Sequence, residues 1–499
     1  MTAGPTSAQS SGLRPEWDGR RLLIGGEFVE GGGPVLDVDD PATGEIIARV
    51  ATADPGQVDA AVAAARAAFE RGEWAGLDGA RRRDAIIRLA DRFESQVEQF
   101  TDAVIAEAGT PVAIAESLQV RAALGHLRSY ADLAAVDHTE DLGPHYEPTP
   151  SHSEVAYRPV GVVAAISAYN YPLVLLMHKI GAALAAGCTA VIMPSPRTPI
   201  TALLLAETIA EAGLPAGVLN VIVGGAGVAR RLTENPGIDK VAFTGSPEVG
   251  AAVMRQAAGN LRGVVLELGG KSPAVVMPDA DLKTVVPQIH LRYCRNGGQA
   301  CAAPTRLLVP RERWAEFLEL SRASYAGIGV GDPRDPSTVV GPMIAEAHRA
   351  RIESYVEAAL AQGATIAAGG GRPEHDRGWY INPVLLVDVD NSWPIAQEEL
   401  FGPVAIAIPY DSLDEAVAIA NDSRFGLHAY VYSADTAAAR TLAGRLRVGS
   451  VTINGGGGMR TDAPMGGLGI SGIGREVGKW GVREYLEPQH IQWAVRRGE

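Results

Sequence analysis

The sequence predicts an α/β fold with parallel sheets, and three observations support this prediction. Short apolar runs of strand length recur along the chain. Longer stretches with apolar residues at helical spacing, such as 199–212 and 247–258, separate these runs. The runs are apolar throughout rather than alternating, which is typical of strands covered on both faces. The expected strands are 161–167, 189–193, 219–223, 240–243, 273–276, 306–309, 404–408, 429–432 and 450–453.

The remaining elements follow from local composition. Residues 57–71 and 80–106 are predicted to form two further helices, since both are rich in alanine and have polar faces. Residues 137–152 are polar and contain proline, so we expect an irregular element that is inserted or protrudes. The glycines and prolines of residues 369–378 predict a surface loop.

Length and composition restrict the class of protein. A chain of 499 residues is too long for one core, so two or three domains are expected. A net charge of −14 argues against nucleic-acid and anionic-membrane partners. No apolar run reaches about 18 residues and no signal peptide is visible, so we expect a cytoplasmic protein. The three cysteines include no C-x-x-C pair, which predicts no disulfide framework and no metal site.

Cys301 is the strongest candidate for a catalytic side chain. It follows Gly298-Gln299-Ala300 and precedes Ala302-Ala303-Pro304, so it lies among turn formers and small residues rather than in an apolar run. This context is typical of a nucleophile presented by a loop. Cys188 and Cys294 lie beside a strand and in a helical stretch, and we interpret both as structural.

The segment after the expected strand 240–243 resembles an anion-binding turn. Gly245 suits the turn, and Ser246 is a good N-cap for the following helix. A strand, a glycine turn and a helix N-terminus together present backbone N–H groups to an anion. An ordinary strand-to-helix turn explains the segment equally well. The fingerprint G-x-G-x-x-G is absent, because Arg230 stands where the third glycine after 225–227 should fall.

Two polar side chains are placed to assist a thiol. Glu267 ends the apolar run 263–266 and precedes two glycines, so its carboxylate can swing in a crevice at the end of a strand. Partial burial would raise its pKa toward that of a general base. The alternative is an ion pair with Lys271. Asn170 follows a strand and can donate to a developing oxyanion, although Asn before an aromatic residue and Pro is also ordinary turn chemistry.

These segments, in this order, resemble the aldehyde dehydrogenase superfamily. The resemblance covers nearly the whole chain, from Leu23-Ile24-Gly25-Gly26-Glu27-Phe28 to Glu484-Tyr485-Leu486-Glu487. The motifs that carry it are Glu267-Leu268-Gly269-Gly270-Lys271, Gly298-Gln299-Ala300-Cys301, Glu398-Glu399-Leu400-Phe401-Gly402-Pro403, Pro464-Met465-Gly466-Gly467 and Ser471-Gly472-Ile473-Gly474-Arg475-Glu476.

The resemblance implies two Rossmann-like parallel-sheet domains and a small β arm for oligomerisation. Residues 20–137 with 160–267 would form the cofactor-binding domain, 268–477 the catalytic domain, and 138–159 with 478–497 the arm. The arm implies a homodimer or homotetramer. The alternating tail 491–495 fits an edge strand that pairs with a partner.

The resemblance also implies a covalent mechanism. Cys301 would attack an aldehyde, and Asn170 and the Cys301 backbone N–H would hold the oxyanion of the thiohemiacetal. Hydride transfer to a nicotinamide would leave a thioester, and Glu267 would activate the water that hydrolyses it. Lys179 and Glu476 match positions that the family uses to relay this proton.

The implied cofactor site departs from the family pattern at one segment. The family usually has Lys where this chain has Met193, and many NAD-preferring members have Glu where it has Pro196. Neither side chain can hydrogen-bond a ribose hydroxyl, and Arg197 lies nearby. We predict NAD as the main cofactor, with NADP also accepted. The implied cofactor residues are Ile166, Ser167, Ala168, Tyr169, Met193, Ser195, Gly245, Ser246, Leu268, Glu399 and Phe401; the alternatives are a core Phe401 and a surface ion pair at Glu399.

The implied substrate site is roomy. Small residues flank the nucleophile, and four consecutive glycines at 455–458 occupy the expected mouth. The residues expected to line the tunnel are Tyr171, His178, Ala300, Ala302 and Met465. We therefore predict a medium-to-large or aromatic aldehyde as the small-molecule partner, unless neighbouring loops refill the space.

Two other functions are compatible with the sequence. A CoA-acylating relative would use a thiol in place of water, but such relatives commonly lack the carboxylate that Glu267 supplies. A non-catalytic binding protein on the same fold is favoured only by the altered segment 193–196. The retained Cys301, Glu267, Asn170 and Glu399 argue against it.

Overall fold

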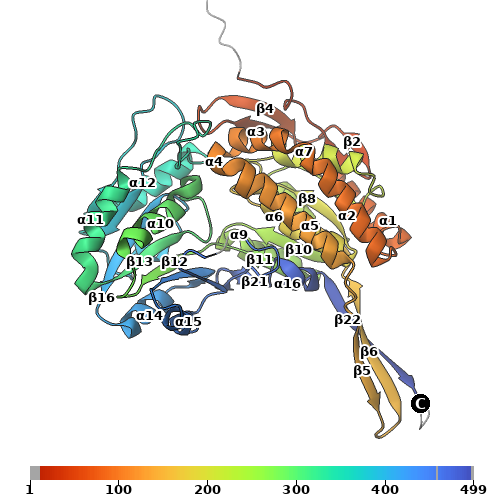
Figure 1. Cartoon of the computed structure of the whole chain (residues 1–499). Coiled ribbons are helices and arrows are strands. Elements are labelled where there is room, and N and C mark those ends of the chain that lie inside the picture. Colours follow the sequence, from red (N-terminus) through yellow and green to blue (C-terminus); the bar gives the residue numbers. More distant parts are fainter. Residues whose placement is uncertain (1–11, 457–458, 496–499) are drawn as a thin grey trace, which may run out of the picture.

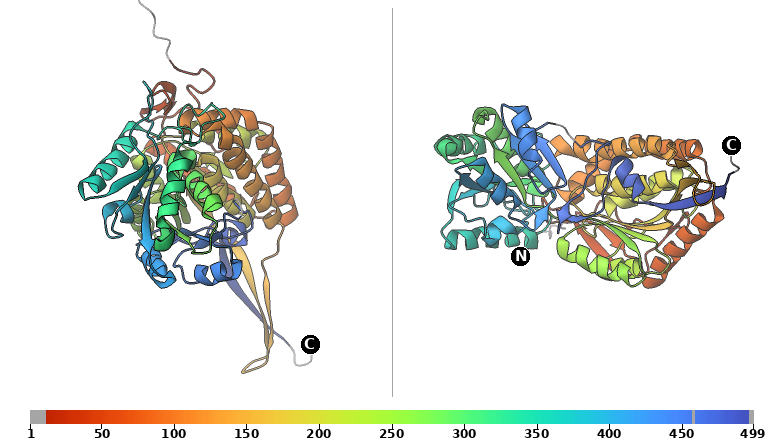
Figure 2. Two further views of the ribbon diagram at one scale, coloured as in Figure 1. Left: turned by 60° about the vertical axis from the view of Figure 1, so that its left-hand side comes forward. Right: turned by 90° about the horizontal axis from the view of Figure 1, so that it is seen from below.

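A computed structural model describes residues 12–456 and 459–495. It confirms the α/β prediction: two large sheets, each covered by helices, lie side by side, and a narrow arm projects from the first unit (Figure 1). The two units are also distinct in the rotated views of Figure 2. Gly457 and Gly458 of the predicted mouth, and positions 496–497 of the predicted arm, lie outside the described residues.

The first sheet has the strand order β2-β1-β9-β8-β7-β10-β11-β21. Its five central strands are parallel, while β1, β2 and β21 join the edges in antiparallel orientation. The strands are β1 (Leu22–Ile24), β2 (Glu27–Val29), β7 (Val162–Ile166), β8 (Thr189–Met193), β9 (Leu219–Val221), β10 (Lys240–Thr244), β11 (Gly263–Glu267) and β21 (Gly472–Ile473).

The helices of this unit precede and alternate with its parallel strands. They are α1 (Pro55–Arg71), α2 (Gly79–Glu94), α3 (Val97–Ala108), α4 (Val112–Ile114), a π-helical turn (Ala115–Arg121), α5 (Ala122–Ala134), α6 (Pro172–Ala186), α7 (Ile200–Glu211), α8 (Ala226–Thr233) and α9 (Pro247–Ala258). A separate hairpin, β3 (Val35–Asp39) with β4 (Ile46–Ala51), lies outside the large sheets.

The second sheet has the order β14-β15-β16-β13-β12-β18-β19, and only β14 is antiparallel to its neighbour. Its strands are β12 (Ser272–Val276), β13 (Pro304–Pro310), β14 (Thr365–Gly369), β15 (Val384–Val387), β16 (Val404–Tyr410), β18 (His428–Tyr432) and β19 (Ser450–Ile453). Its helices are α10 (Leu282–Cys294), α11 (Trp314–Tyr325), α12 (Glu346–Ala361), α13 (Pro394–Gln397), α14 (Leu413–Asn421) and α15 (Thr436–Ala443); β17 (Phe425–Gly426) and β20 (Leu468–Gly469) form a small pair.

The arm is a three-stranded antiparallel sheet that projects from the first unit, as the family resemblance implied, although the composition of 137–152 predicted an irregular segment (Figure 1). Its strands are β5 (Glu140–His145), β6 (Ser151–Pro159) and β22 (Leu486–Ala494), in the order β22-β6-β5. The prediction of irregular structure is wrong because β5 and β6 pair with each other, and β6 also pairs with β22; the polar composition of this segment does not predict such pairing. The tail 491–495 was expected to pair with a partner chain. In the structure it belongs to β22, which follows the short helix α16 (Gly478–Arg483) and pairs with β6 of the same chain.

The predicted helix over 80–106 is also wrong, because the chain breaks it into α2 and α3. Gln96 has φ −116° and ψ 14°, which is not helical. The Ser95 hydroxyl donates to the backbone oxygen of Arg92 at 2.7 Å, a local bond that competes with helix continuation. The other predicted helices are confirmed, and 57–71 begins two residues early because Asp54 and Gln57 form a capping box.

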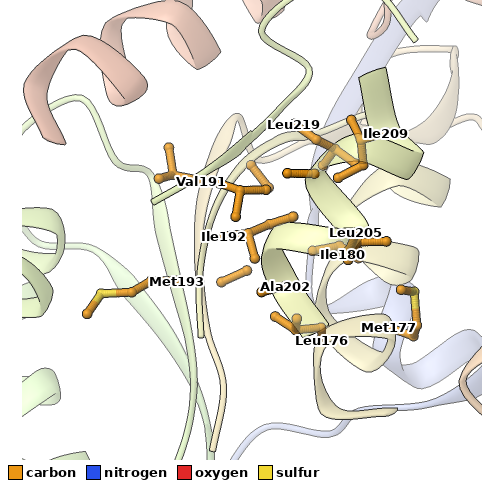
Figure 3. Packing of buried hydrophobic residues seen from close by; sticks show 14 of the residues in the cluster. Leu176, Met177, Ile180, Val191, Ile192, Met193, Ala202, Leu205, Ile209 and Leu219 are labelled. Carbon is orange, nitrogen blue, oxygen red and sulfur yellow. The ribbon is translucent and has the colours of Figure 1, made fainter. Parts of the chain in front are cut away.

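The core of the first unit packs β8 and β9 against α6 and α7. Figure 3 shows Ile192 facing the side chains of α6 and α7, whereas Met193 points away from that cluster. Successive residues of a strand face opposite sides, so Met193, which is also buried, lies on the other face of the sheet and lines the main cavity. No helix of the described residues is long and apolar enough to cross a membrane.

Candidate active site

A strained turn presents Cys301. The chain leaves α10 through Asn296, Gly297 and Gly298, which have φ values of 55°, 64° and 71°. A side chain at Gly298 would place its Cβ 2.2 Å from the backbone of Gly402, so only glycine fits. The half-buried thiol of Cys301 follows at the wall of the main cavity.

Asn170 lies against this turn. Its side-chain Nδ2 donates to the backbone oxygen of Gln299 at 3.0 Å, two residues before the thiol. The Asn170 backbone oxygen in turn accepts from Asn296 Nδ2 at 3.1 Å and from Gln119 Nε2 at 3.1 Å. Asn170 is therefore a buried carboxamide that is held beside the nucleophile loop, and it is more than a turn residue.

The thiol is neutral at rest. Burial raises the pKa of Cys301 to about 12, and the nearby carboxylates Glu399 and Glu267 add to the effect. Attack on a carbonyl requires the thiolate, so the site needs a base or a cation at the moment of reaction.

Glu267 lies deeper in the structure than the thiol. It ends β11 and is 2% exposed, and neither carboxylate oxygen has a hydrogen-bond partner among the described residues. Burial raises the pKa of Glu267 well above its usual value, and the Glu476 charge raises it further. The alternative of an ion pair with Lys271 is not observed within the described part of the chain. Gly466 packs so closely that a Cβ there would lie 2.8 Å from Glu267 Oε1.

Lys179 and Glu476 form a buried ion pair below Glu267. Lys179 Nζ lies 2.5 Å from Glu476 Oε1 and donates to Thr244 Oγ1 at 2.6 Å. Burial opposes ionisation of Glu476, but the Lys179 ammonium, followed by His178, holds the pKa of that carboxyl down at about 2. The pair thus stays charged in the interior, next to a carboxyl that prefers to be protonated.

A single cavity of about 1540 Å³ lies between the two sheets. It is lined by Cys301, Asn170, every residue predicted for the cofactor and every residue predicted for the substrate. Glu267, Lys179 and Glu476 are buried and lie outside its lining. The sequence prediction therefore divides into a lining set and a buried set.

The predicted anion-binding turn has the expected geometry. Ser246 caps α9 by accepting from Val249 N at 3.4 Å, and Pro247 occupies the first turn. A Cβ at Gly245 would lie 2.4 Å from the ring of Phe243. Pro247 has no N–H and the Val249 N–H is bonded to Ser246, so the Glu248 N–H and the positive end of the helix dipole remain to favour an anion at this part of the cavity lining.

Glu399 and Phe401 bound the same part of the cavity. Glu399 Oε1 accepts from Gly270 N at 2.9 Å, and burial raises the pKa of this carboxyl to about 7. Phe401 has φ 59°, and its ring lies edge-on to Tyr169 at 5.9 Å. Neither a core position for Phe401 nor a surface ion pair for Glu399 is observed among the described residues.

Residues 193–197, at the end of β8, contribute few polar groups to the cavity. Met193 and Pro196 both line the cavity. Arg197, by contrast, is absent from its lining, and its guanidinium lies 3.6 Å from the Asp39 carboxylate.

The structure adds cavity residues that sequence reasoning missed. His126 faces His178 edge-on at 4.4 Å, and both rings are buried. The two His126 ring nitrogens have no hydrogen-bond partner in the described residues, whereas His178 Nδ1 lies 3.4 Å from Glu476 Oε2. Tyr430 donates its hydroxyl hydrogen to Ala302 O at 3.0 Å. Arg292 and Arg295 line the cavity at the end of α10. Their spacing of three, just before the nucleophile motif, is the one sequence signal for any of these residues.

Comparison with known proteins agrees with this architecture. Residues 28–491 match the profile of the aldehyde dehydrogenase family. Geranial dehydrogenase of Castellaniella defragrans is 41% identical over 471 residues, which cover 94% of this chain and 97% of the relative. These matches span nearly the whole of both chains.

Solved structures give the same result. A point mutant of aldehyde dehydrogenase C from Pseudomonas syringae, in complex with NAD+ and octanal, superposes with a TM-score of 0.90 at 39% identity, covering 96% of this chain and 97% of that one. Betaine aldehyde dehydrogenase from Staphylococcus aureus, in complex with NAD+, gives 0.92 at 35% identity, covering 96% and 95%.

Fold and cavity together define an oxidoreductase of the two-sheet α/β type. More specifically, the chain belongs to the aldehyde dehydrogenase family. No cluster of three or more metal-ligating side chains is found among the residues described.

Proposed function

We propose that the protein oxidises an aldehyde to the carboxylic acid with NAD+, through a thiohemiacetal and a thioester on Cys301. The observation that carries the proposal is the shared cavity. The thiol, the Asn170 carboxamide and the helix-capping turn at Ser246 all lie on it, so a carbonyl and a nucleotide can occupy one space.

The residues present fit a nicotinamide nucleotide. The N-terminus of α9 and the side-chain-free turn at Gly245 suit a pyrophosphate, because backbone N–H groups and the helix dipole favour an anion there. Glu399 offers a carboxylate for ribose hydroxyls. Arg197 is engaged with Asp39, so a 2′-phosphate would gain no free cation from it, which favours NAD over NADP. When bound, the nicotinamide supplies the acceptor for the hydride that the thiohemiacetal loses.

The first step belongs to Cys301. Its thiol loses a proton, the sulfur bonds to the aldehyde carbon, and the carbonyl oxygen becomes an oxyanion. The Asn170 N–H that is not bonded to Gln299 O, together with the Cys301 backbone N–H, is suited to hold this oxyanion. Since burial raises the pKa of the thiol to about 12, the proton needs an acceptor such as Glu267.

The second step belongs to Glu267. A water molecule attacks the thioester carbon, Glu267 takes its proton, and the Cys301 thiolate leaves as the acid is released. The carboxylate must move from its buried position toward the cavity for this step. The charged Lys179–Glu476 pair lies behind it and offers a route for the proton after each turnover.

The volume of the cavity supports a medium-to-large aldehyde. About 1540 Å³ exceeds what a nucleotide alone needs, since pockets for ligands of drug size span roughly 300–1,000 Å³. The relatives named for geranial and bound to octanal act on or hold aldehydes of that size.

We further propose the assembly and domain limits. The arm presents the outer edges of β5 and β22, and such edges favour pairing with a second copy in a homodimer or homotetramer. Residues 20–137 with 160–267 correspond to the cofactor-binding domain, 268–477 to the catalytic domain, and 138–159 with 478–497 to the arm.

The test is NADH formation from octanal by the wild type and by Cys301→Ala, with NADP+ and CoA as further arms. We expect activity in the wild type alone, higher efficiency with NAD+ than with NADP+, and octanoate as the product even when CoA is added. An acyl-CoA product would favour the acylating alternative. Absence of both activity and thermal stabilisation by NAD+ would favour the binding protein.

A further inference from the structure

The substrate half of the cavity is cationic although the chain as a whole is acidic. This half lies beyond Cys301 and is bounded by α6, the end of α10 and residues 424–465. Its charged lining residues are Arg292, Arg295, Arg424 and Arg460. The carboxylates among the described lining residues, Glu248, Glu398 and Glu399, all lie on the opposite, nucleotide side.

Arg292 and Arg295 lie nearest to the nucleophile loop. Arg292 lies in the last turn of α10, and Arg295 is the residue that follows the helix; both line the cavity. The Arg292 guanidinium lies 5.0 Å from the centre of the Tyr430 ring, and that tyrosine's hydroxyl reaches Ala302 O at 3.0 Å. One tyrosine side chain therefore separates Arg292 from the residue next to the thiol.

Neither arginine has a counterion in the described residues. Arg292 donates one long bond, at 3.5 Å, to the backbone oxygen of Gly455, and Arg295 has no hydrogen bond or ion pair there. Both side chains are half-buried. Arg460 differs, because it is paired with Asp462 at 2.6 Å.

A half-buried guanidinium without an anion is an unusual lining for an apolar pocket. Removing water from a guanidinium costs free energy. A bound carboxylate or phosphate would offset this cost, because the guanidinium can form two parallel hydrogen bonds with either group. Leu427, Ile453 and Met465 line the same half and suit a carbon chain. The wall thus combines an apolar stretch with a cationic end.

We propose that Arg292 and Arg295 bind an anionic oxygen group at the far end of the aldehyde, so that the preferred substrates are aldehyde acids rather than purely apolar aldehydes. The proposal rests on the proposed aldehyde oxidation and refines its substrate class. The aldehyde carbon would lie at Cys301 and the anion beside α10, with the carbon chain against the apolar wall between them.

The test compares octanal with its ω-carboxylate analogue, 8-oxooctanoate, on the full-length enzyme with NAD+. We expect kcat/KM to favour 8-oxooctanoate in the wild type. In Arg295→Met, the ratio of the two values should fall about 10- to 100-fold, the size of a charge-assisted hydrogen bond, while octanal oxidation persists. Arg295→Lys keeps the charge and should restore part of the ratio. Arg255→Gln, at an exposed position outside the cavity lining, is the matched control and should leave the ratio nearly unchanged.

The experiment distinguishes failure of the anion-binding proposal from failure of the proposed aldehyde oxidation. An unchanged ratio in Arg295→Met and Arg292→Met, or a wild-type preference for octanal, overturns the proposal while leaving aldehyde oxidation intact. Failure of the wild type on both substrates overturns the oxidation itself. A third aldehyde of similar length that ends in a phosphate monoester distinguishes the anion: the larger ratio identifies the group bound, and either supports the proposal.

Discussion

The buried ion pair between Lys179 and Glu476 allows a quantitative prediction. The two side chains are 0% and 1% exposed, and their nearest nitrogen and oxygen atoms are 2.5 Å apart. Lys179→Met keeps an unbranched side chain but removes the cation, which leaves the Glu476 carboxylate buried without compensation. Breaking a buried pair in this way costs about 3–5 kcal/mol.

The loss should depend on pH. In the wild type the folded pKa of Glu476 is about 2, below its usual value, so the pair stabilises the fold above about pH 4.5 and this contribution is lost as pH falls toward 2. Without Lys179, only His178 opposes the effect of burial, so the folded pKa of Glu476 rises. The variant should therefore be nearer to the wild type at pH 5 than at pH 8.

Thermal and urea midpoints of the wild type, Lys179→Met, Glu476→Gln and the double variant test this reasoning. The double variant should lose less stability than the two single losses added together, because the singles share one interaction. Arg230→Met, which breaks the exposed Arg230–Glu234 pair, is the control and should leave the midpoint unchanged. If Lys179→Met matched this control at pH 8, the buried pair would not stabilise the fold.

Three further predictions concern other positions. Gly245→Ala should raise the Kd for NAD+ about tenfold by calorimetry, because the new Cβ would meet an aromatic ring at 2.4 Å and displace the turn; an unchanged Kd would exclude that turn from the nucleotide site. His126→Leu should raise the thermal midpoint, since it removes ring nitrogens that are buried without partners, whereas a lower midpoint would contradict the assigned packing. Burial raises the pKa of Glu107 to about 7, so its ionisation should destabilise the wild type as pH rises from 4.5 through 7. Glu107→Gln should flatten that dependence, and parallel pH curves for the two proteins would refute it.

Much of the sheet structure could be predicted because it is encoded locally. The runs 189–193 and 450–453 became strands with the predicted bounds: the first is almost entirely apolar and buried, and the second alternates β-branched residues with polar ones. The β1 to β4 strands escaped prediction because they are short and only partly apolar. β1 pairs with β2 and β3 with β4 in local hairpins, and only the contact of β1 with β9 is distant in sequence. The helix break at Gln96 likewise has no glycine or proline to announce it.

The candidate site divides in the same way. Cys301, Glu267 and Glu399 lie in sequence motifs, so their residue types and neighbours predicted them as site residues from the sequence alone. Arg295 and His126 do not: each lies in a helical stretch where a polar residue ordinarily faces solvent. Their place in the cavity lining follows only from the packing of α5 and of the segment after α10.

The central claim is that Cys301 carries an acyl group that Glu267 helps to hydrolyse. Intact-protein mass spectrometry of Glu267→Gln, mixed with octanal and NAD+, tests it most directly. We expect a stoichiometric burst of NADH, slower than in the wild type because Glu267 also accepts the thiol proton, and a gain of one octanoyl mass. This mass should map to Cys301 and be absent from Glu267→Gln combined with Cys301→Ala. Burst formation without an adduct, or an adduct on Cys188 or Cys294, would contradict it.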